Sequence, residues 1–198
     1  VVIATGAKGR RDGTGRWLEQ AVPGSERPSV LTPDDIMAGV MPTGPVVIYD
    51  DDHYYMGGVI AEKLRREGLD VTLVTPANEA STWTTHTEEQ YRIQERILSL
   101  GITLETGTTL ARIDEESVAL ECIYTGEIQP VQAAATVMVT SRQPQDQLFY
   151  SLVDQLAIQR IGDCLAPGTI ATSVYSGHQY ARELDTEVMV PVPFRRER

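Results

Sequence analysis

The sequence predicts an α/β protein in which a βαβ unit with parallel strands is followed by an antiparallel β-meander. The βαβ unit consists of a buried apolar strand, a helix and a second strand, at residues 46–50, 56–67 and 70–75. Its joints are short, and the crossover between its strands should be right-handed. The meander is indicated by apolar or alternating segments with turn residues between them, at residues 108–113, 117–123 and 128–139.

Capping residues and apolar runs place the remaining elements. Thr32 and Pro33 provide a cap and a first-turn proline for a brief helix over 34–38, which follows a short strand at 30–31. The run 87–90, Thr-Glu-Glu-Gln, has the capping-box pattern and opens another helix. The apolar face of that helix is formed by Ile93, Ile97 and Leu100. The other predicted elements are a core strand at 1–4, a third parallel strand at 102–105, helices at 145–157 and 169–184, and a strand at 159–161.

The predicted organisation is nested, with one unit inserted in another. A compact unit at residues 44–140 interrupts a second unit built from residues 1–43 and 141–198. Val1 begins directly inside a predicted strand and is not a methionine, so we interpret the chain as a fragment of a larger polypeptide. The tail at 191–198 is basic and follows a proline, and we expect it to be mobile or to dock on the missing parts.

Charge and cysteine content restrict the function. A net charge of −11 excludes a partner held mainly through its phosphates, such as a nucleic acid. No apolar run is long enough for a membrane-spanning helix, and the composition suits a cytoplasmic enzyme. The two cysteines, Cys122 and Cys164, lie far apart without metal-ligand spacing, and we interpret them as reduced structural thiols. An iron–sulfur cluster normally needs four thiolates, so this chain cannot build one alone.

The turn at residues 50–58 aligns with the glycine-rich turn of dinucleotide-binding βαβ units. Such a turn carries G-x-G-x-x-G, so that bare backbone can approach a pyrophosphate. Here the three glycine positions hold Asp50, Asp52 and Tyr55. The carboxylates would repel a pyrophosphate, and the tyrosine would block its approach.

The end of the strand at 70–75 gives a second indication about this turn. An NAD site has an acidic residue there for the ribose, and an NADP site has an arginine nearby. Thr75 and Pro76 provide neither, so the sequence disfavours NAD(P) binding. We interpret the carboxylates as caps of the helix start, with the pocket filled by side chains. A cation site made from the three aspartates and His53 is the alternative.

Two short signatures lie at the ends of predicted strands, Ala4-Thr5-Gly6 and Ile161-Gly162-Asp163. Glycine lets the backbone approach a ligand closely, and a strand-end aspartate can bind a ribityl or ribose hydroxyl. The helix that starts near Gly168-Thr169-Ile170 would point its positive end at a phosphate. An ordinary strand-end role for Asp163 is the alternative.

Three aromatic residues receive a structural interpretation. His178 falls on the apolar face of the last predicted helix, which fits a hydrogen-bonded core histidine better than a catalytic group. Trp17 and Trp83 are interpreted as packing residues.

With these residues in place, the chain resembles the C-terminal part of the trimethylamine dehydrogenase family. That family includes dimethylamine and histamine dehydrogenases and is related to 2,4-dienoyl-CoA reductase and old yellow enzyme. The matching stretches cover nearly the whole chain and are Val1 to Ala7, Asp50 to Leu64, Val71 to Val74, Ile161 to Asp163, Tyr175 to His178 and Ala181 to Leu184. The most specific stretch is DDDHYYMGGVIAEKL, because the related reductases keep glycines in this turn.

The resemblance implies a parent enzyme with an N-terminal (β/α)8 barrel carrying FMN, a 4Fe–4S cluster and two domains like those of disulfide reductases. This chain would then hold a Rossmann-like, three-layer NAD(P)-binding-like domain at 44–140, with a degenerate glycine motif. That domain would be inserted in a truncated FAD/ADP-binding-like domain at 1–43 and 141–198. By the same resemblance, ADP or FAD would bind the second domain, at a site lined by Thr5, Gly6, Gly162 and Asp163.

The family's catalytic residues and cluster cysteines lie upstream of this chain. The expected function is therefore a non-catalytic segment of an amine dehydrogenase that oxidises a C–N bond at FMN. Its electrons would pass to an external acceptor such as electron-transferring flavoprotein. The expected partners are the missing barrel domain and further copies of the parent in a homo-oligomer, with no nucleic acid and no membrane. The two alternatives are an NAD(P)H-dependent flavin reductase of the 2,4-dienoyl-CoA reductase type and a non-catalytic ADP-binding structural module.

Overall fold

The computed structural model describes residues 1–184, which divide into two compact units. The larger unit is Gly9–Arg142, and the smaller one is formed by Val1–Lys8 together with the chain from Gln143. Residues 9–43 pack with the larger unit, whereas the sequence had placed them with the chain ends. The reason is β3 (Val30–Leu31), which joins the main sheet of the larger unit as an edge strand.

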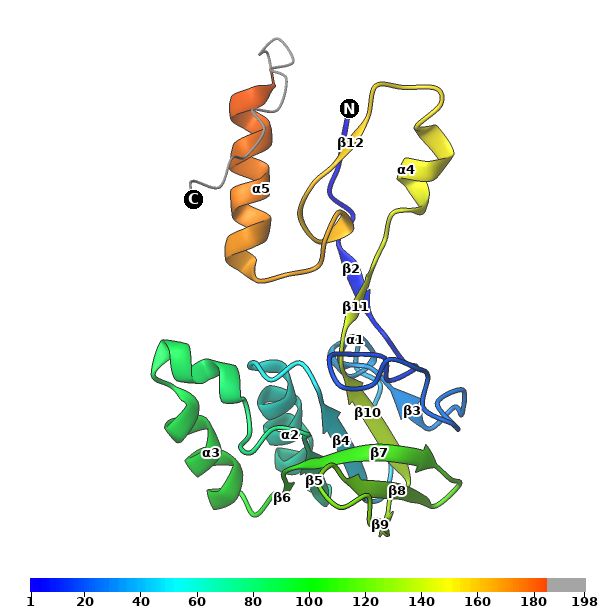
Figure 1. The fold of residues 1–198 in the computed structure, drawn as a ribbon, viewed down its shortest axis with the longest axis vertical. Coiled ribbons are helices and arrows are strands. Elements are labelled where there is room, and N and C mark those ends of the chain that lie inside the picture. The colour runs from blue at the N-terminus through cyan, green and yellow to red at the C-terminus, as the bar shows by residue number, and fades with distance from the viewer. Residues whose placement is uncertain (185–198) are drawn as a thin grey trace. The chain divides into compact units, whose positions relative to one another are not determined.

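The larger unit is built on a five-stranded parallel sheet in the order β3-β10-β4-β5-β6 (Figure 1). Besides β3, its strands are β4 (Val46–Asp50), β5 (Val71–Val74), β6 (Thr103–Glu105) and β10 (Ala135–Val139). Every residue of β4 and β10 is buried, which is typical of parallel strands covered on both faces. The predicted parallel strands of the βαβ unit and the strand after it are confirmed.

Helices cover one face of this sheet. They are α1 (Pro33–Met37), α2 (Met56–Arg66), the short 3-10 helix η1 (Thr82–Thr87) and α3 (Gln90–Ser99). On α2, Ile60, Ala61 and Leu64 are fully buried and belong to the same core cluster as Ile48 and Leu73 of the sheet. Burial of such a face is what holds an amphipathic helix on a sheet.

The capping box predicted at 87–90 is wrong. Helix α3 begins after Glu89, which makes no side-chain capping bond, and Glu88 has a left-handed backbone at φ 59°. The Glu89 carboxylate instead accepts a hydrogen bond from the hydroxyl of Tyr55. A capping box does occur at α1, where Thr32 and Asp35 satisfy each other's backbone N–H groups.

The other face of the sheet is covered by an antiparallel meander, which gives the unit three layers (Figure 1). The strands of this meander are β7 (Thr108–Ile113), β8 (Ser117–Cys122) and β9 (Ile128–Gln132). The side chains of Tyr49 and Met138 in the sheet form a second core cluster with Leu110 and Leu120 of the meander. The run predicted at 128–139 divides into β9 and β10, which belong to different sheets.

The smaller unit contains a two-stranded parallel sheet, β1 (Val2–Ile3) with β12 (Gln159–Arg160). Its other elements are α4 (Gln147–Leu152), the 3-10 helix η2 (Gly162–Cys164) and α5 (Ile170–Glu183). Strands β2 (Ala7–Gly9) and β11 (Arg142–Pro144), which contain the two points where the chain crosses from one unit to the other, pair with each other.

Two predictions for this smaller unit need correction. The helix expected at 145–157 is only the six residues of α4, and in the strand expected at 1–4 only Ile3 is buried. The tail at 191–198 lies outside the described residues. Within residues 1–184, no helix has the length and apolar character needed to cross a membrane.

Candidate functional site

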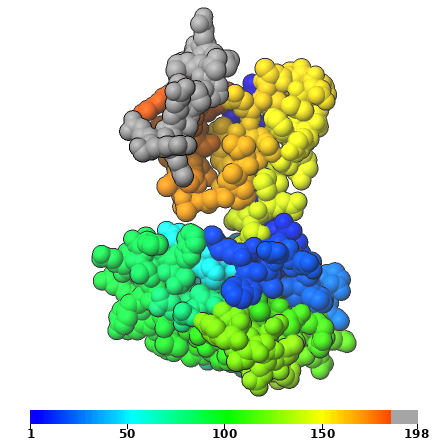
Figure 2. Space-filling model, in the orientation of Figure 1, coloured from blue at the N-terminus to red at the C-terminus, as the bar shows by residue number. Residues whose placement is uncertain are grey.

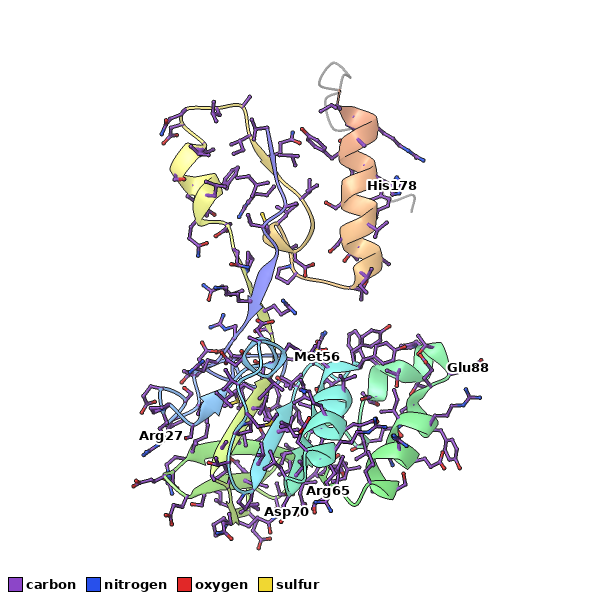
Figure 3. All side chains as sticks on the ribbon, turned by 180° about the vertical axis from the view of Figure 1, so that it is seen from behind. Arg27, Met56, Arg65, Asp70, Glu88 and His178 are labelled. Atoms are coloured by element: carbon purple, nitrogen blue, oxygen red, sulfur yellow. The ribbon has the colours of Figure 1, made fainter. Side chains whose placement is uncertain are left out.

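The candidate site lies at the carboxyl edge of the main sheet, where β4 ends at Asp50. Met56, which begins α2 after β4, marks the carboxyl ends of the parallel strands, and Asp70, which precedes β5, marks their amino ends (Figure 3). In open α/β sheets, ligands bind at the carboxyl ends of the strands. The turn of residues 50–55 occupies this position between β4 and α2.

Asp50 binds the turn that follows it. Its Oδ1 atom accepts hydrogen bonds from the backbone N–H groups of Asp52 and His53, both at 3.1 Å. Its Oδ2 atom is buried and has no hydrogen-bond partner. A Cβ atom placed on Gly57 would lie 2.3 Å from Oδ2, so the carboxyl group fills the space beside the start of α2. Burial raises the pKa of Asp50 to about 7, against the opposing effect of the hydrogen bond from His53.

Asp51 binds a loop that is distant in sequence. Its Oδ2 atom accepts hydrogen bonds from the backbone N–H groups of Arg16, at 2.6 Å, and Trp17, at 2.8 Å. A Cβ atom on Gly15 would lie 2.3 Å from this oxygen, so only glycine fits there without a shift. Figure 2 shows this early loop, in blue, on the surface of the larger unit next to the cyan segment that contains the turn.

His53 fills the space between the ends of β4 and β5. Its Nε2 atom lies 3.3 Å from Asp51 Oδ1, and its Nδ1 atom lies 3.4 Å from Thr75 Oγ1. The side chain is only 11% exposed, and the backbone is left-handed at φ 63°. Thr75 follows β5, at the position where an NAD site has its acidic residue. The imidazole therefore occupies the space between Asp51 and Thr75 at the carboxyl ends of β4 and β5.

The backbone N–H groups of residues 51–53 are already used. Those of Asp51 and Asp52 donate to the carbonyl oxygen of Val139, at 2.9 and 3.1 Å, and those of Asp52 and His53 donate to Asp50. The predicted role of the carboxylates as helix caps is therefore wrong in detail. They bind the turn and the early loop, while Tyr55, the N-cap of α2, makes no side-chain capping bond.

The outer side of the turn is lined by Asp52, Arg16 and Trp83. The Arg16 guanidinium lies over the Trp83 ring, 4.3 Å from its centroid. The backbone N–H of Trp83 donates a hydrogen bond to the carbonyl oxygen of His53 at 3.0 Å. Burial raises the pKa of Asp52, and the charge of Arg16 opposes this effect. Trp17 and Trp83 are 49% and 46% exposed, so the packing role predicted for them involves only about half of each side chain.

The cation site considered for the aspartates and His53 finds no support. Within residues 1–184 no group of three or more histidine, cysteine, aspartate or glutamate side chains is arranged to hold a metal ion. The thiols of Cys122 and Cys164 are both free; Cys164 is buried, and its Sγ atom lies 3.6 Å from the carbonyl oxygen of Ile3. A hydrogen bond with Thr125 lowers the pKa of Cys122.

The four residues predicted to line a nucleotide site lie together in the smaller unit. Because β1 and β12 are parallel neighbours, Thr5 and Gly6 leave the sheet at the same end as Gly162 and Asp163. Gly6 and Gly162 have positive φ angles, 75° and 61°, which favour glycine. The Thr5 hydroxyl donates to the carbonyl oxygen of Gln145.

Asp163 is held by groups that follow it in sequence. Its Oδ1 atom accepts hydrogen bonds from the Ser173 hydroxyl at 2.8 Å and the Gly168 N–H at 3.3 Å. The Gly162 N–H donates to Ser176 Oγ at 2.9 Å. Ser173 and Ser176 were missed by sequence reasoning, although their spacing on one helical face was a usable signal. His178, in contrast, is exposed on α5 and is not a core histidine (Figure 3).

A model of the OYE-like second alpha/beta domain matches residues 31–143, more than half of the chain. The curated dimethylamine dehydrogenase of Hyphomicrobium sp. (strain x) is 31% identical over the whole chain, which spans 31% of that protein. The chain belongs to the trimethylamine dehydrogenase family. The resemblance read from the sequence is thereby confirmed.

Solved structures of this family agree with the assignment. Histamine dehydrogenase from Rhizobium sp. 4-9 is 42% identical with a TM-score of 0.91, over 100% of this chain and 32% of that one. The 6-hydroxypseudooxynicotine amine oxidase HisD from Pseudomonas geniculata N1 is 38% identical, also with a TM-score of 0.91, over 94% of this chain and 29% of that one. The chain thus spans about a third of the length of these relatives. The family domain at 31–143 contains the closed turn, whereas Thr5 and Asp163 lie outside it.

Proposed function

We propose that this chain is the C-terminal, nucleotide-binding-like part of an amine dehydrogenase and does not itself carry the catalytic residues. In the complete enzyme a C–N bond would be oxidised at FMN in a barrel domain, and a 4Fe–4S cluster would pass electrons to an external acceptor such as electron-transferring flavoprotein. The support is the identity of 31–42% to a dimethylamine dehydrogenase, a histamine dehydrogenase and an amine oxidase.

The turn of residues 50–53 supports the proposal most strongly, because it lies at the carboxyl end of β4 but lacks the free N–H groups that a pyridine nucleotide would need there. Its N–H groups bind protein oxygens, and Asp50 and Asp51 place buried carboxyl groups where a pyrophosphate would need donors. His53 lies between Asp51 and Thr75, where we expect the ribose of such a nucleotide to lie. An enzyme that takes electrons from an amine does not need NAD(P)H as an electron donor. A Rossmann-like NAD(P)-binding-like domain can then be retained for a structural role without binding the nucleotide.

Anaerobic reduction of the full-length protein tests this function. We expect small secondary and aromatic amines to bleach the flavin absorbance, and NADPH and NADH to leave it unchanged over the same time. Dimethylamine and histamine are the first amines to try, because relatives of this chain are named for them. Bleaching by NADPH together with no response to any amine would instead support a flavin reductase.

The smaller unit is the proposed ADP-binding-like domain, with Thr5, Gly6, Gly162 and Asp163 at the ligand. These residues fit a nucleotide, because the two glycines allow close backbone approach and the aspartate stands at a strand end beside α5. The Oδ1 atom of Asp163 is held by Ser173. We propose that its Oδ2 atom accepts a hydrogen bond from a ribose hydroxyl.

The variant Asp163→Asn tests this second site. It keeps an acceptor for Ser173 but loses the charged acceptor, so we expect ADP affinity of the full-length protein to fall about tenfold or more, by calorimetry. Asp154→Asn, an exposed carboxylate of the same unit, is the matched control and should leave ADP affinity unchanged. Equal affinities for all three proteins would show that Asp163 does not contact the nucleotide.

A further inference from the structure

The turn contains two fully buried carboxyl groups, and in each of them one oxygen accepts hydrogen bonds while the other accepts none. One oxygen of Asp50 and one oxygen of Asp51 each accept two backbone N–H groups. The second oxygen of each, Asp50 Oδ2 and Asp51 Oδ1, is buried and accepts no hydrogen bond. An ionised oxygen in that condition is strongly unfavourable, so the turn is best stabilised when at most one of the two groups is charged.

The surroundings of the Asp50 carboxyl group favour its protonated form. Asp51 Oδ1 lies 3.3 Å from His53 Nε2, so the imidazole is the polar group nearest to this oxygen among the contacts of the described residues. Asp50 Oδ2 faces Gly57 of α2 and has no hydrogen-bond partner in the described structure, and burial outweighs the opposing charge effect of His53 on the pKa of Asp50. The other titratable or charged groups that face the cluster are Tyr49, Asp52, Arg16 and Arg142. The low-energy closed state therefore has a proton on Asp50.

The same residues hold two segments that are distant in sequence. Asp51 accepts the N–H groups of Arg16 and Trp17, and the carbonyl oxygen of His53 accepts the N–H of Trp83 in η1. His53 itself has a positive φ, a conformation that persists in a non-glycine residue only while its surroundings hold it. The protonation state of the cluster and the attachment of these segments are thus coupled through the same atoms.

We propose that Asp50, Asp51 and His53 form a proton-linked latch, which holds the loop of residues 15–17 and η1 at the carboxyl edge of the sheet and releases both when Asp50 loses its proton to solvent. On deprotonation, Asp50 becomes a buried anion in the same turn as the buried carboxyl group of Asp51, and its Oδ2 atom accepts no hydrogen bond. Admission of water to the turn then lowers the energy and breaks the bonds to the two segments. The raised pKa of Asp50 agrees with release near neutral pH.

Hydrogen–deuterium exchange of the full-length protein, measured at about pH 6 and about pH 8.5, tests the latch. After correction for the intrinsic rate, the amides of Arg16, Trp17, Asp52, His53 and Trp83 should exchange about tenfold faster at the higher pH, since one pKa unit of differential proton binding changes an equilibrium tenfold. Peptides from β8, which lies in the meander, should show no such change and report any global unfolding.

Two variants make the test specific. Asp50→Asn keeps the shape of the side chain without a titrating proton, so its exchange at these amides should stay slow at both pH values. Asp70→Asn, at the opposite end of the sheet, should retain the wild-type response to pH. The latch is excluded if the wild-type amides do not respond to pH, if Asp50→Asn responds as strongly as wild type, or if β8 accelerates equally.

Discussion

Replacement of Gly57 by alanine is expected to destabilise the protein by about 2–3 kcal/mol, among the largest effects of any single added methyl group in this chain. The new Cβ atom would lie 2.3 Å from Oδ2, 2.5 Å from Cγ and 2.9 Å from Cβ of Asp50. Both residues are buried between β4 and α2, so neither side can move without breaking the core. Denaturant unfolding followed by circular dichroism measures the loss.

Two further variants separate this clash from a general effect of alanine. Gly177→Ala places its Cβ atom on α5 with no atom within 4 Å, and it should be neutral or slightly stabilising because alanine favours helix. The double variant Gly57→Ala with Asp50→Ala should recover part of the lost stability, because the colliding carboxyl group is gone. A Gly57→Ala protein as stable as Gly177→Ala would contradict the close packing of the turn on α2.

The second large effect is the response of stability to pH at Asp50. Burial raises its pKa from 3.8 to about 7, so the folded protein binds a proton that the unfolded chain has released between these values. The free energy of unfolding must therefore fall as the pH rises from about 4 to about 7, and level off above that range. Asp50→Asn removes this dependence and should be more stable than wild type at about pH 8, by up to about 3 kcal/mol.

Thermal unfolding of both proteins at several pH values checks this prediction. The difference in Tm between Asp50→Asn and wild type should be small near pH 4 and grow towards pH 7. Asp70→Asn alters an exposed carboxylate paired with Arg65 and should show no growing difference. A wild-type protein that gains stability relative to Asp50→Asn as the pH rises would show that the buried group is ionised at little cost.

Most of the fold could be predicted because it depends on local signals. Apolar runs identified β4, β5 and β10, and the alternation at residues 108–123 identified β7 and β8. The departure of Asp50, Asp52 and Tyr55 from the glycine pattern also indicated a closed turn. Capping was less predictable. The Thr-Glu-Glu-Gln pattern at 87–90 is local, whereas the group that binds Glu89 is the hydroxyl of Tyr55, which is distant in sequence.

The detailed closure of the turn could not be predicted, because its contacts join residues far apart in sequence. Nothing near Gly15 or Trp17 indicates that this loop lies against Asp51, about 35 residues later, and the positive φ of His53 has no sequence signal. The prediction of a core position for His178 was wrong for a related reason. A periodic pattern shows which face of α5 is apolar, but not what covers that face, and α5 has no buried residue.

We propose that the turn of residues 50–55 is closed to pyridine nucleotides. Titration of the full-length protein with NADPH and NADH by isothermal calorimetry tests it most directly, with ADP titrated into the same preparation as a separate nucleotide. We expect no heat of binding for either pyridine nucleotide up to millimolar concentration. Binding of NADPH or NADH with a micromolar dissociation constant would contradict the claim, because the N–H groups and the space that such a ligand requires are occupied by Asp50, Asp51 and His53.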